Sequence, residues 1–347
     1  MRCNCAVFHP PCGAGRMGVC FLHVVVLMTR PGFSAALLHP RYWLLWLGLG
    51  LLWLIIQLPY PVLLRLGRLV GWFMYLFMAE RREIARINLE LCFPDWSAQE
   101  RRRVLRENFA SNGIALFEMA MAWWWPKQRL AGLARIEGLE HLQQAAAEGQ
   151  GVVLMSAHFT TLEIGAALLG QQATIDGMYR EHKNAAFDHV QRRGRERHND
   201  DAVAVERDDV RSMLKSLRRG RAIWYAPDQD YGRKASVFVP LFGVNAATVT
   251  ATATFARLGK ARVVPFTQTR LADGQGYLLR VHPPLESFPA GDELADARRI
   301  NQWVEQEILQ QPEQYMWVHR RFKTRPEGEE RPYPQRQRKR RKKRRGS

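Results

Sequence analysis

The most constraining feature of the chain is an apolar run from Tyr42 to Leu64 that contains no charged residue. A helix that crosses a bilayer needs about 20 consecutive apolar residues, so the run is long enough to cross once. Proline interrupts the hydrogen bonding of a helix, and Pro59 and Pro61 therefore predict its end. We expect an N-terminal transmembrane helix; the alternative is the core helix of a soluble domain.

Arginines follow this run closely, at positions 65, 68, 81, 82 and 86. Positive charge accumulates on the cytoplasmic side of membrane proteins, which predicts that the chain after residue 64 lies in the cytoplasm. A second apolar stretch, residues 69–78, is expected to lie in the membrane interface or against the domain.

Both ends of the chain read as lying outside the fold. Residues 1–27 contain a short apolar run without a signal-peptidase site, and we expect a non-native or disordered extension before Met28. Residues 331–347 read as a basic disordered tail, because Lys and Arg fill almost all of the stretch from Arg336 to Arg345. The tail either stays solvated or rests on anionic lipid. No aromatic residues interleave its charges, so we expect no nucleic-acid partner.

Cysteine usage indicates a reducing compartment rather than a disulfide framework. Of the five cysteines, only Cys92 lies beyond the first twenty residues. The pair Cys3 and Cys5 is spaced too closely for a zinc site and has no second pair to complete it. We expect neither a metal nor a cofactor.

From residue 151 onward, strand-like and helix-like segments alternate. Residues 151–156, 173–179, 222–225, 263–268 and 276–281 read as strands, with helical patterns between most of them. This rhythm predicts an α/β fold in which helices cover a mixed β-sheet. We therefore divide the chain into an extension (1–27), a membrane anchor (28–64), a catalytic domain (65–330) and the tail (331–347).

The chemistry is expected at His158, which stands where the strand 151–156 passes into a helix. Ligands bind at such carboxyl ends of strands in open α/β sheets. Glu163, placed in the first helical turn, would take the proton of one imidazole nitrogen and leave the other to accept a proton from a hydroxyl. That arrangement serves acyl transfer to an alcohol without a covalent enzyme intermediate. On spacing alone, a purely structural histidine is the alternative.

His158 followed by Glu163 after a buried strand resembles the His-x-x-x-x-Asp/Glu signature of the lysophospholipid acyltransferase superfamily. The chain further resembles one branch of it, the late acyltransferases of lipid A biosynthesis in Gram-negative bacteria, and most nearly those that transfer lauroyl. The blocks that carry this resemblance are residues 33–43, 88–94, 224–232 and 312–326.

The resemblance implies a glycerolipid acyltransferase-like fold and a set of site residues. His158 is then the general base and Glu163 its orienting acid. Substrate binding falls to Arg180, Asp228, Asp230, His319, Arg320 and Arg321. Alternatives stay open: a surface ion pair for Arg180, a strand-end turn for the two aspartates, and solvated cations near the C-terminus.

The resemblance also implies the reaction and its place. The donor would be acyl-acyl carrier protein, carrying lauroyl, and the acceptor a 3-hydroxyacyl hydroxyl of Kdo2-lipid IVA at the cytoplasmic face of the inner membrane. The arginines at 192, 193, 195 and 197 offer either a face for the acidic carrier or a solvated helix. The rivals are a glycerolipid acyltransferase, whose Phe-Pro-Glu-Gly-Thr-like block is missing, and a non-enzymatic membrane tether.

Overall fold

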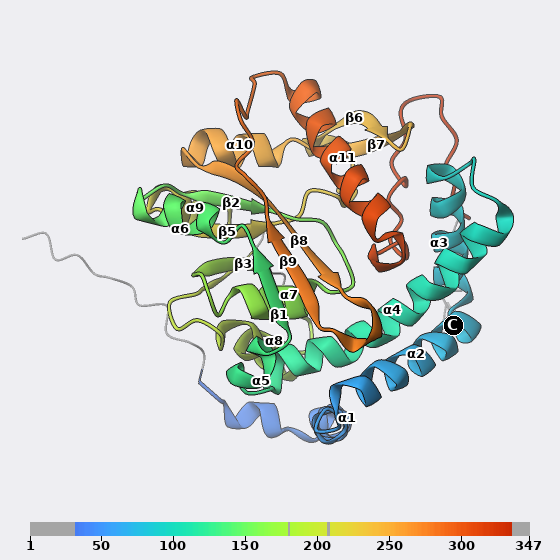
Figure 1. The fold of residues 1–347 in the computed structure, drawn as a ribbon, viewed down its shortest axis with the longest axis vertical. Coiled ribbons are helices and arrows are strands. Elements are labelled where there is room, and N and C mark those ends of the chain that lie inside the picture. The colour runs from blue at the N-terminus through green and yellow to red at the C-terminus, as the bar shows by residue number, and fades with distance from the viewer. Residues whose placement is uncertain (1–31, 180, 207–208, 335–347) are drawn as a thin grey trace, which may run out of the picture. The chain divides into compact units, whose positions relative to one another are not determined.

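A seven-stranded sheet forms the centre of the computed structural model, which describes residues 32–179, 181–206 and 209–334 (Figure 1). The strand order is β1-β9-β8-β2-β5-β3-β4, and every pair is parallel except β8 with β9. The strands are β1 (Ala134–Glu137), β2 (Val152–Met155), β3 (Ile175–Tyr179), β4 (Ala204–Glu206), β5 (Ala222–Tyr225), β8 (Arg262–Arg270) and β9 (Tyr277–Val281). The predicted mixed sheet is confirmed.

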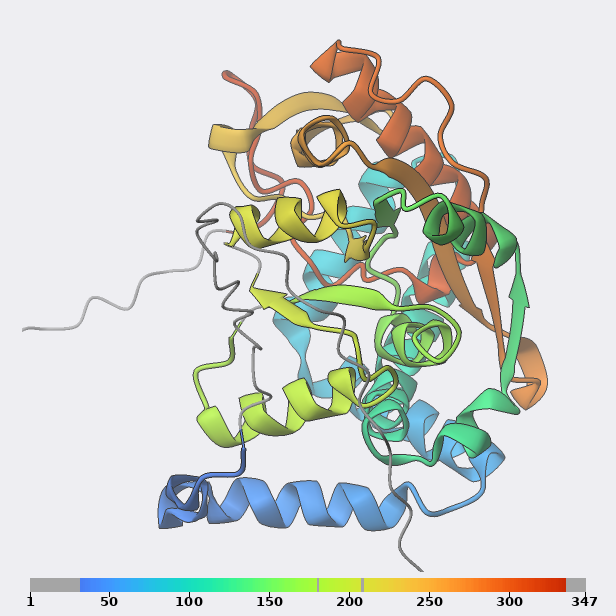
Figure 2. The same cartoon turned by 90° about the vertical axis from the view of Figure 1, so that its left-hand side faces the viewer.

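Helices cover both faces of this sheet, as predicted (Figures 1 and 2). The helices are α1 (Trp43–Ile55), α2 (Tyr60–Phe77), α3 (Ala79–Cys92), α4 (Ala98–Trp124), α5 (Lys127–Ala131), α6 (Glu140–Ala147), α7 (Leu162–Leu169), α8 (Ala185–Glu196), α9 (Val210–Arg218), α10 (Ala251–Gly259) and α11 (Glu293–Gln310).

Strand β2 lies at the centre of the core, and all of its residues are buried. Val153 and Met155 join an apolar cluster with α9, α10 and α11, whereas Val152 and Leu154 join a second cluster with α4, α6 and α7. A parallel strand covered on both faces needs an unbroken apolar run, which is the pattern that predicted it.

The predicted transmembrane helix over residues 42–64 does not form as one helix. It breaks between Ile55 and Tyr60, so that its first part becomes α1 and its last part the start of α2. Pro59 explains the break, because it has no N–H to donate and disfavours a helical conformation in the residue before it. Pro61, which was expected to end the helix, instead stands in the first turn of α2, where a missing N–H costs nothing.

In the described part of the chain, no single helix is both long and apolar enough to cross a bilayer. Helices α2 and α3 meet the length and composition only when taken together, and they are bent by 94° to each other. The boundary expected at residue 64 falls inside α2. The predicted extension of residues 1–27 and the run Arg336–Arg345 lie outside the described residues.

Four strands were not predicted: β1 and β4, which form the two edges of the main sheet, and β6 and β7. Strands β6 (Ser236–Leu241) and β7 (Val244–Val249) form an antiparallel hairpin apart from the main sheet, and β7 takes the first two residues of a helix that the sequence pattern predicts over residues 248–258. The chain after α11, which includes a short 3-10 turn at Pro312–Gln314, returns to the carboxyl end of β2, where Tyr315 forms an isolated bridge with Phe159.

Candidate active site

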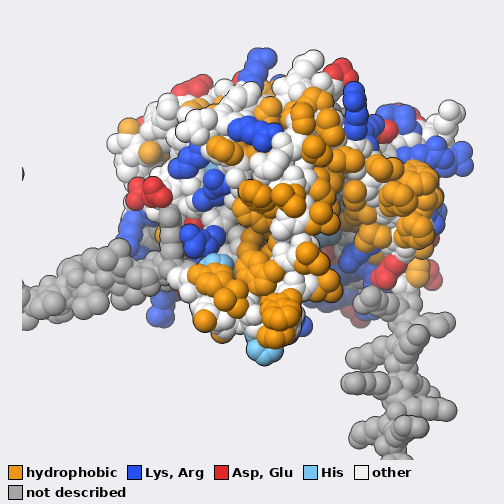
Figure 3. Space-filling view, turned by 90° about the horizontal axis from the view of Figure 1, so that it is seen from below, with side chains coloured by type: hydrophobic (Ala, Val, Ile, Leu, Met, Phe, Trp, Pro, Cys, Tyr) orange, Lys and Arg blue, Asp and Glu red, His pale blue; other side chains and the backbone are white. Residues whose placement is uncertain are grey.

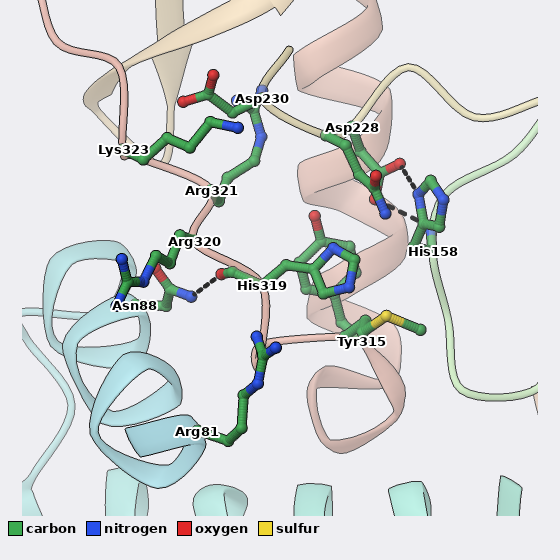
Figure 4. Close-up of a pocket in the computed structure, with 12 residues that line it drawn as sticks. Arg81, Asn88, His158, Asp228, Asp230, Tyr315, His319, Arg320, Arg321 and Lys323 are labelled. Carbon is green, nitrogen blue, oxygen red and sulfur yellow. Dashed lines mark hydrogen bonds and ion pairs between the residues drawn. The ribbon is translucent and has the colours of Figure 1, made fainter. Parts of the chain in front are cut away.

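His158 lies just beyond the carboxyl end of β2, as predicted. Strand β5 pairs with β2 in parallel, with Met155 opposite Tyr225, so both strands deliver the residues that follow them to the same edge of the sheet. The third residue after β5 is Asp228. Its carboxylate accepts a hydrogen bond from the His158 backbone N–H at 2.9 Å, and its other oxygen lies 2.6 Å from His158 Nδ1 (Figure 4).

The environment of this pair fixes the charge of Asp228 and the tautomer of His158. Burial opposes ionisation of Asp228, but the charge and hydrogen bonds of His158 outweigh it and hold the pKa of Asp228 at about 2. Asp228 is therefore a carboxylate at neutral pH and an acceptor for Nδ1–H. That tautomer leaves the lone pair of His158 on Nε2, where it can accept a proton.

Glu163, predicted as the orienting acid, is not bonded to His158 in the structure, which pairs the histidine with Asp228 instead. Helix α7 begins only at Leu162, and the carboxylate of Glu163 is bound by Arg195 of α8, whose Nε lies 3.1 Å from Oε1. Trp123 Nε1 of α4 donates to it at 3.2 Å. Glu163 thus joins α4, α7 and α8 behind the histidine.

A pocket of about 280 Å³ opens beside His158 (Figure 4). It is built from four parts of the chain that are distant in sequence: helix α3, the loop after β2, the loop after β5, and the segment after α11. Its lining comprises Arg81, Asn88, His158, Asp228, Gln229, Asp230, Tyr315, Met316, His319, Arg320, Arg321 and Lys323.

The pocket brings together most of the predicted site residues, namely His158, Asp228, Asp230, His319, Arg320 and Arg321. Arg180 lies outside the described residues, and Glu163 is not part of the lining. Sequence reasoning missed Arg81, Asn88 and Tyr315 as site residues. Asn88 and Tyr315 belong to blocks that carried the family resemblance, whereas Arg81 was interpreted only as part of the positive charge after the apolar run.

Two of the predicted binding residues are tied into the fold. Asp230 accepts hydrogen bonds from the Thr324 N–H at 2.8 Å, the Thr324 hydroxyl at 2.9 Å and the Gly232 N–H at 2.9 Å. Arg321 is buried and donates to the Ala247 carbonyl oxygen at 2.8 Å, which joins the C-terminal segment to the β6–β7 hairpin. Both residues shape the pocket from behind.

His319 faces His158 across the pocket, with 6.2 Å between the ring centroids. Burial, together with the positive charge of a protonated His158, lowers the pKa of His319 to about 4. At neutral pH its imidazole is therefore uncharged and carries one N–H donor.

Asparagines of α3 and α4 hold the segment that carries His319. Asn88 Nδ2 donates to the carbonyl oxygens of Trp317 at 2.6 Å and His319 at 2.7 Å. Asn108 Nδ2 donates to that of Tyr315 at 2.6 Å. The His158 carbonyl oxygen accepts from the Met316 N–H at 2.9 Å, so the segment is also bonded to the base itself.

The site offers protein donors and acceptors rather than metal ligands. Over residues 32–179, 181–206 and 209–334, no three His, Cys, Asp or Glu side chains converge to hold an ion. A base with a fixed tautomer, a neutral imidazole facing it and the arginines at 81 and 320 suit proton transfer beside a developing negative charge.

Comparison with known proteins places this site in a family. The family model described as "Bacterial lipid A biosynthesis acyltransferase" matches residues 30–324. The lipid A biosynthesis lauroyltransferase of Escherichia coli (strain K12) is 49% identical over 303 residues, which cover 87% of this chain and 98% of that protein. The lipid A biosynthesis palmitoleoyltransferase of the same organism is 47% identical over 298 residues, covering 86% and 96%.

Among solved structures, that of the 1-acyl-sn-glycerophosphate (LPA) acyltransferase, PlsC, from Thermotoga maritima also aligns. The TM-score is 0.34 and the identity 13%, over 71% of this chain and 96% of that one. A likeness this weak carries no argument, and the assignment rests on the sequence matches. The chain belongs to the bacterial lipid A biosynthesis acyltransferase family.

Proposed function

We propose that this lipid A acyltransferase transfers lauroyl from acyl-acyl carrier protein to a 3-hydroxyacyl hydroxyl of Kdo2-lipid IVA, at the cytoplasmic face of the inner membrane. The observation that carries the proposal is the His158–Asp228 pair, which leaves Nε2 as the basic nitrogen of a histidine that lines a pocket with cationic walls. The names of the two relatives above support the substrate class, and the lauroyltransferase is marginally the more similar of the two.

The reaction follows from the geometry of the pair. His158 Nε2 takes the proton of the acceptor hydroxyl while its oxygen attacks the carbonyl carbon of the thioester. The C–O bond forms, the tetrahedral intermediate collapses with cleavage of the C–S bond, and the leaving thiolate recovers the proton from the imidazolium. Asp228 stabilises the imidazolium between these two steps. His319, neutral at this stage, donates its N–H to the oxyanion.

Carrier recognition is not assigned to the arginines of α8. Arg195 is bound to Glu163, Arg192 Nε donates to Glu196 at 3.0 Å, and Arg197 donates to the Trp123 carbonyl oxygen at 2.8 Å. Of the four arginines noted in the sequence, Arg193 is the exposed one. Three of the four arginines therefore contact groups of the domain itself, whereas the sequence suggested either a carrier-binding face or a solvated helix.

The test is transfer by the purified enzyme from lauroyl-acyl carrier protein to labelled Kdo2-lipid IVA, with palmitoleoyl- and myristoyl-acyl carrier protein and lauroyl-coenzyme A as competing donors. We expect lauroyl-acyl carrier protein to give the highest kcat/KM, and mass spectrometry of lipid A to gain one lauroyl chain in cells that express the protein. Preference for a different chain would correct the donor alone. Transfer to lysophosphatidic acid but not to Kdo2-lipid IVA would contradict the proposal.

A further inference from the structure

Helices α1 and α2 expose large apolar side chains along one side of the molecule (Figure 3). On α1, Leu44 is 81% and Leu47 70% exposed; on α2, Trp72 is 53% and Phe77 78% exposed. Phe73 packs between these two aromatic residues, with its ring centroid 4.9 Å from that of Trp72 and 6.3 Å from that of Phe77. We call this surface the apolar platform. A contiguous surface of large, exposed apolar side chains marks a site of interaction.

Helix α1 is fastened to the domain at both ends. At its end, the Ile56 carbonyl oxygen accepts a hydrogen bond from Trp125 Nε1 at 2.7 Å. Before its start, Leu37 and Tyr42 pack with Ala186 of α8. Figure 2 shows α1 lying across the bottom of the molecule beneath α8. At about 1.5 Å per residue, a 13-residue helix is also shorter than the roughly 30 Å of bilayer hydrocarbon.

Helix α2 lies flat along α4 and cannot swing away from it. A β-carbon added at Gly113 of α4 would collide with the backbone of Gly67 and Gly71 of α2, so the two helix backbones touch where those glycines meet. Helix α4 in turn belongs to the catalytic core, because its Ser111 hydroxyl lies 2.7 Å from that of Thr160 in the loop after His158. The exposed face of α2 is thus a fixed surface of the domain.

We propose that the apolar platform rests on a phospholipid bilayer with α1 and α2 in the plane of one leaflet, so that the enzyme is attached without crossing the membrane. The occupant is the lipid surface itself. This inference rests on the proposed function, whose acceptor is a membrane lipid. Exposed arginines at 41 and 65 border the platform and complement anionic headgroups.

The arrangement also sets the position of the active site relative to the membrane surface. Helix α2 ends at Phe77, and Arg81, which lines the pocket, follows one helical turn later on α3. Its NH1 donates to the Val318 carbonyl oxygen at 3.1 Å, between the platform and the His319 segment. A lipid whose acyl chains lie in the leaflet below Phe77 therefore presents its polar part at Arg81 and reaches His158 without leaving the membrane.

The first test is flotation of the purified full chain with vesicles of phosphatidylethanolamine and phosphatidylglycerol. Each aromatic ring withdrawn from lipid removes a large apolar area, so Trp72→Glu with Phe77→Glu should lower vesicle binding by about tenfold or more. The matched control is Leu294→Glu with Leu309→Glu, which charges side chains of similar exposure on α11 at the other end of the molecule. Equal binding by both double variants would overturn the proposal.

The second test separates in-plane attachment from crossing. Single cysteines replace His39 and Gln57, which flank α1 and are exposed, while Cys92 is buried and stays. The other native cysteines are changed to serine, at positions 3, 5, 12 and 20. An impermeant maleimide should label both sites only after sealed spheroplasts are permeabilised; labelling of either site in sealed spheroplasts means that α1 crosses.

Acyl-transfer assays of the purified proteins in detergent micelles distinguish a failure of the membrane-attachment proposal from a failure of the proposed function. Platform variants should retain acyl transfer to micellar Kdo2-lipid IVA while they lose vesicle binding. A wild-type protein that binds vesicles but transfers no acyl chain would contradict the proposed function and leave the platform standing.

Discussion

At the scale of single residues, the pairing of His158 with Asp228 makes the sharpest prediction. His158→Ala should lower kcat by about 10²–10⁴, the usual worth of a general base. Asp228→Asn should cost a comparable factor, because an amide can donate to Nδ1 and thereby stabilise the wrong tautomer. Steady-state transfer of labelled lauroyl, with a thermal melt of each variant, measures both effects.

Two neighbouring acids serve as controls for Asp228. Asp230→Asn should lower the Tm more than kcat, since Asp230 bonds Thr324 and Gly232 rather than the base. Glu163→Gln should likewise weaken the Arg195 contact and reduce kcat less than Asp228→Asn does. If Glu163→Gln is inactive and Asp228→Asn active, the assignment of the orienting acid is reversed.

Buried histidines predict how stability depends on pH. Burial lowers the pKa of His198 from 6.5 to about 4, even though Nε2 donates to the Ala122 carbonyl oxygen at 2.6 Å. The unfolded chain then binds the proton more readily, so stability is lost as the pH falls from about 6.5 toward 4. His198→Gln should remove about 2 kcal/mol of the difference in unfolding free energy between pH 7.5 and 5.

Chemical denaturation in detergent at the two pH values measures this difference. His319 has a similarly lowered pKa and stays in place in the variant, so part of the pH dependence should persist. If the unfolding free energy changes by the same amount between pH 7.5 and 5 in the wild type and in His198→Gln, the role given to His198 is wrong.

How well the sequence predicted each site residue depends on whether its signal is a local pattern or a long-range contact. His158 was predictable because a buried apolar run passing into a helix is a local pattern. The partner Asp228 could be placed in the site only through the family resemblance, because its contact requires β5 to lie beside β2, which no local pattern states. Glu163 lies in the first turn of α7, as predicted, but its carboxylate is bound by Arg195 of α8, a long-range contact that no local pattern states.

At the scale of elements, the crossing of α2 and α4 depends on glycine. Gly113→Ala should push the helices apart and cost about 1–3 kcal/mol, because the added methyl group meets the backbone of Gly67 and Gly71. Gly48→Ala on α1 is the matched control: its β-carbon meets nothing within 4 Å, and alanine favours helix by up to about 1 kcal/mol.

Thermal melts of both variants in detergent test this packing. We expect a lower Tm for Gly113→Ala and an equal or higher Tm for Gly48→Ala. A Gly113→Ala protein as stable as the wild type would mean that α2 is free to leave α4, which would also weaken the in-plane arrangement of the apolar platform.

Helices α1 and α2 also show what hydropathy alone cannot predict. The composition of residues 42–64 was interpreted correctly as apolar, and Pro59 already marked a break. Whether the part after the break continues through a bilayer or folds back onto the domain depends on a partner surface. That surface is Gly113 of α4, whose fit to Gly67 and Gly71 becomes visible only once the helices are placed.

At the scale of the whole molecule, the family match predicts which part of the chain is needed. It spans residues 30–324, and the chain covers 98% of the lauroyltransferase. A chain that begins at Met28 should therefore keep full kcat and KM with lauroyl-acyl carrier protein. A stable but inactive protein beginning at Met28 would show that residues 1–27 take part in function.

The pocket draws on the early, middle and late parts of the chain, and this has a consequence for synthesis. Arg81 and Asn88 leave the ribosome first, His158 and Asp228 follow, and Tyr315 to Lys323 come last. With the proposed attachment, a nascent chain exposes the apolar side chains of α1 and α2 before its pocket is complete. We therefore expect attachment to precede activity, which requires the last segment to bond to Asn88 and Asn108.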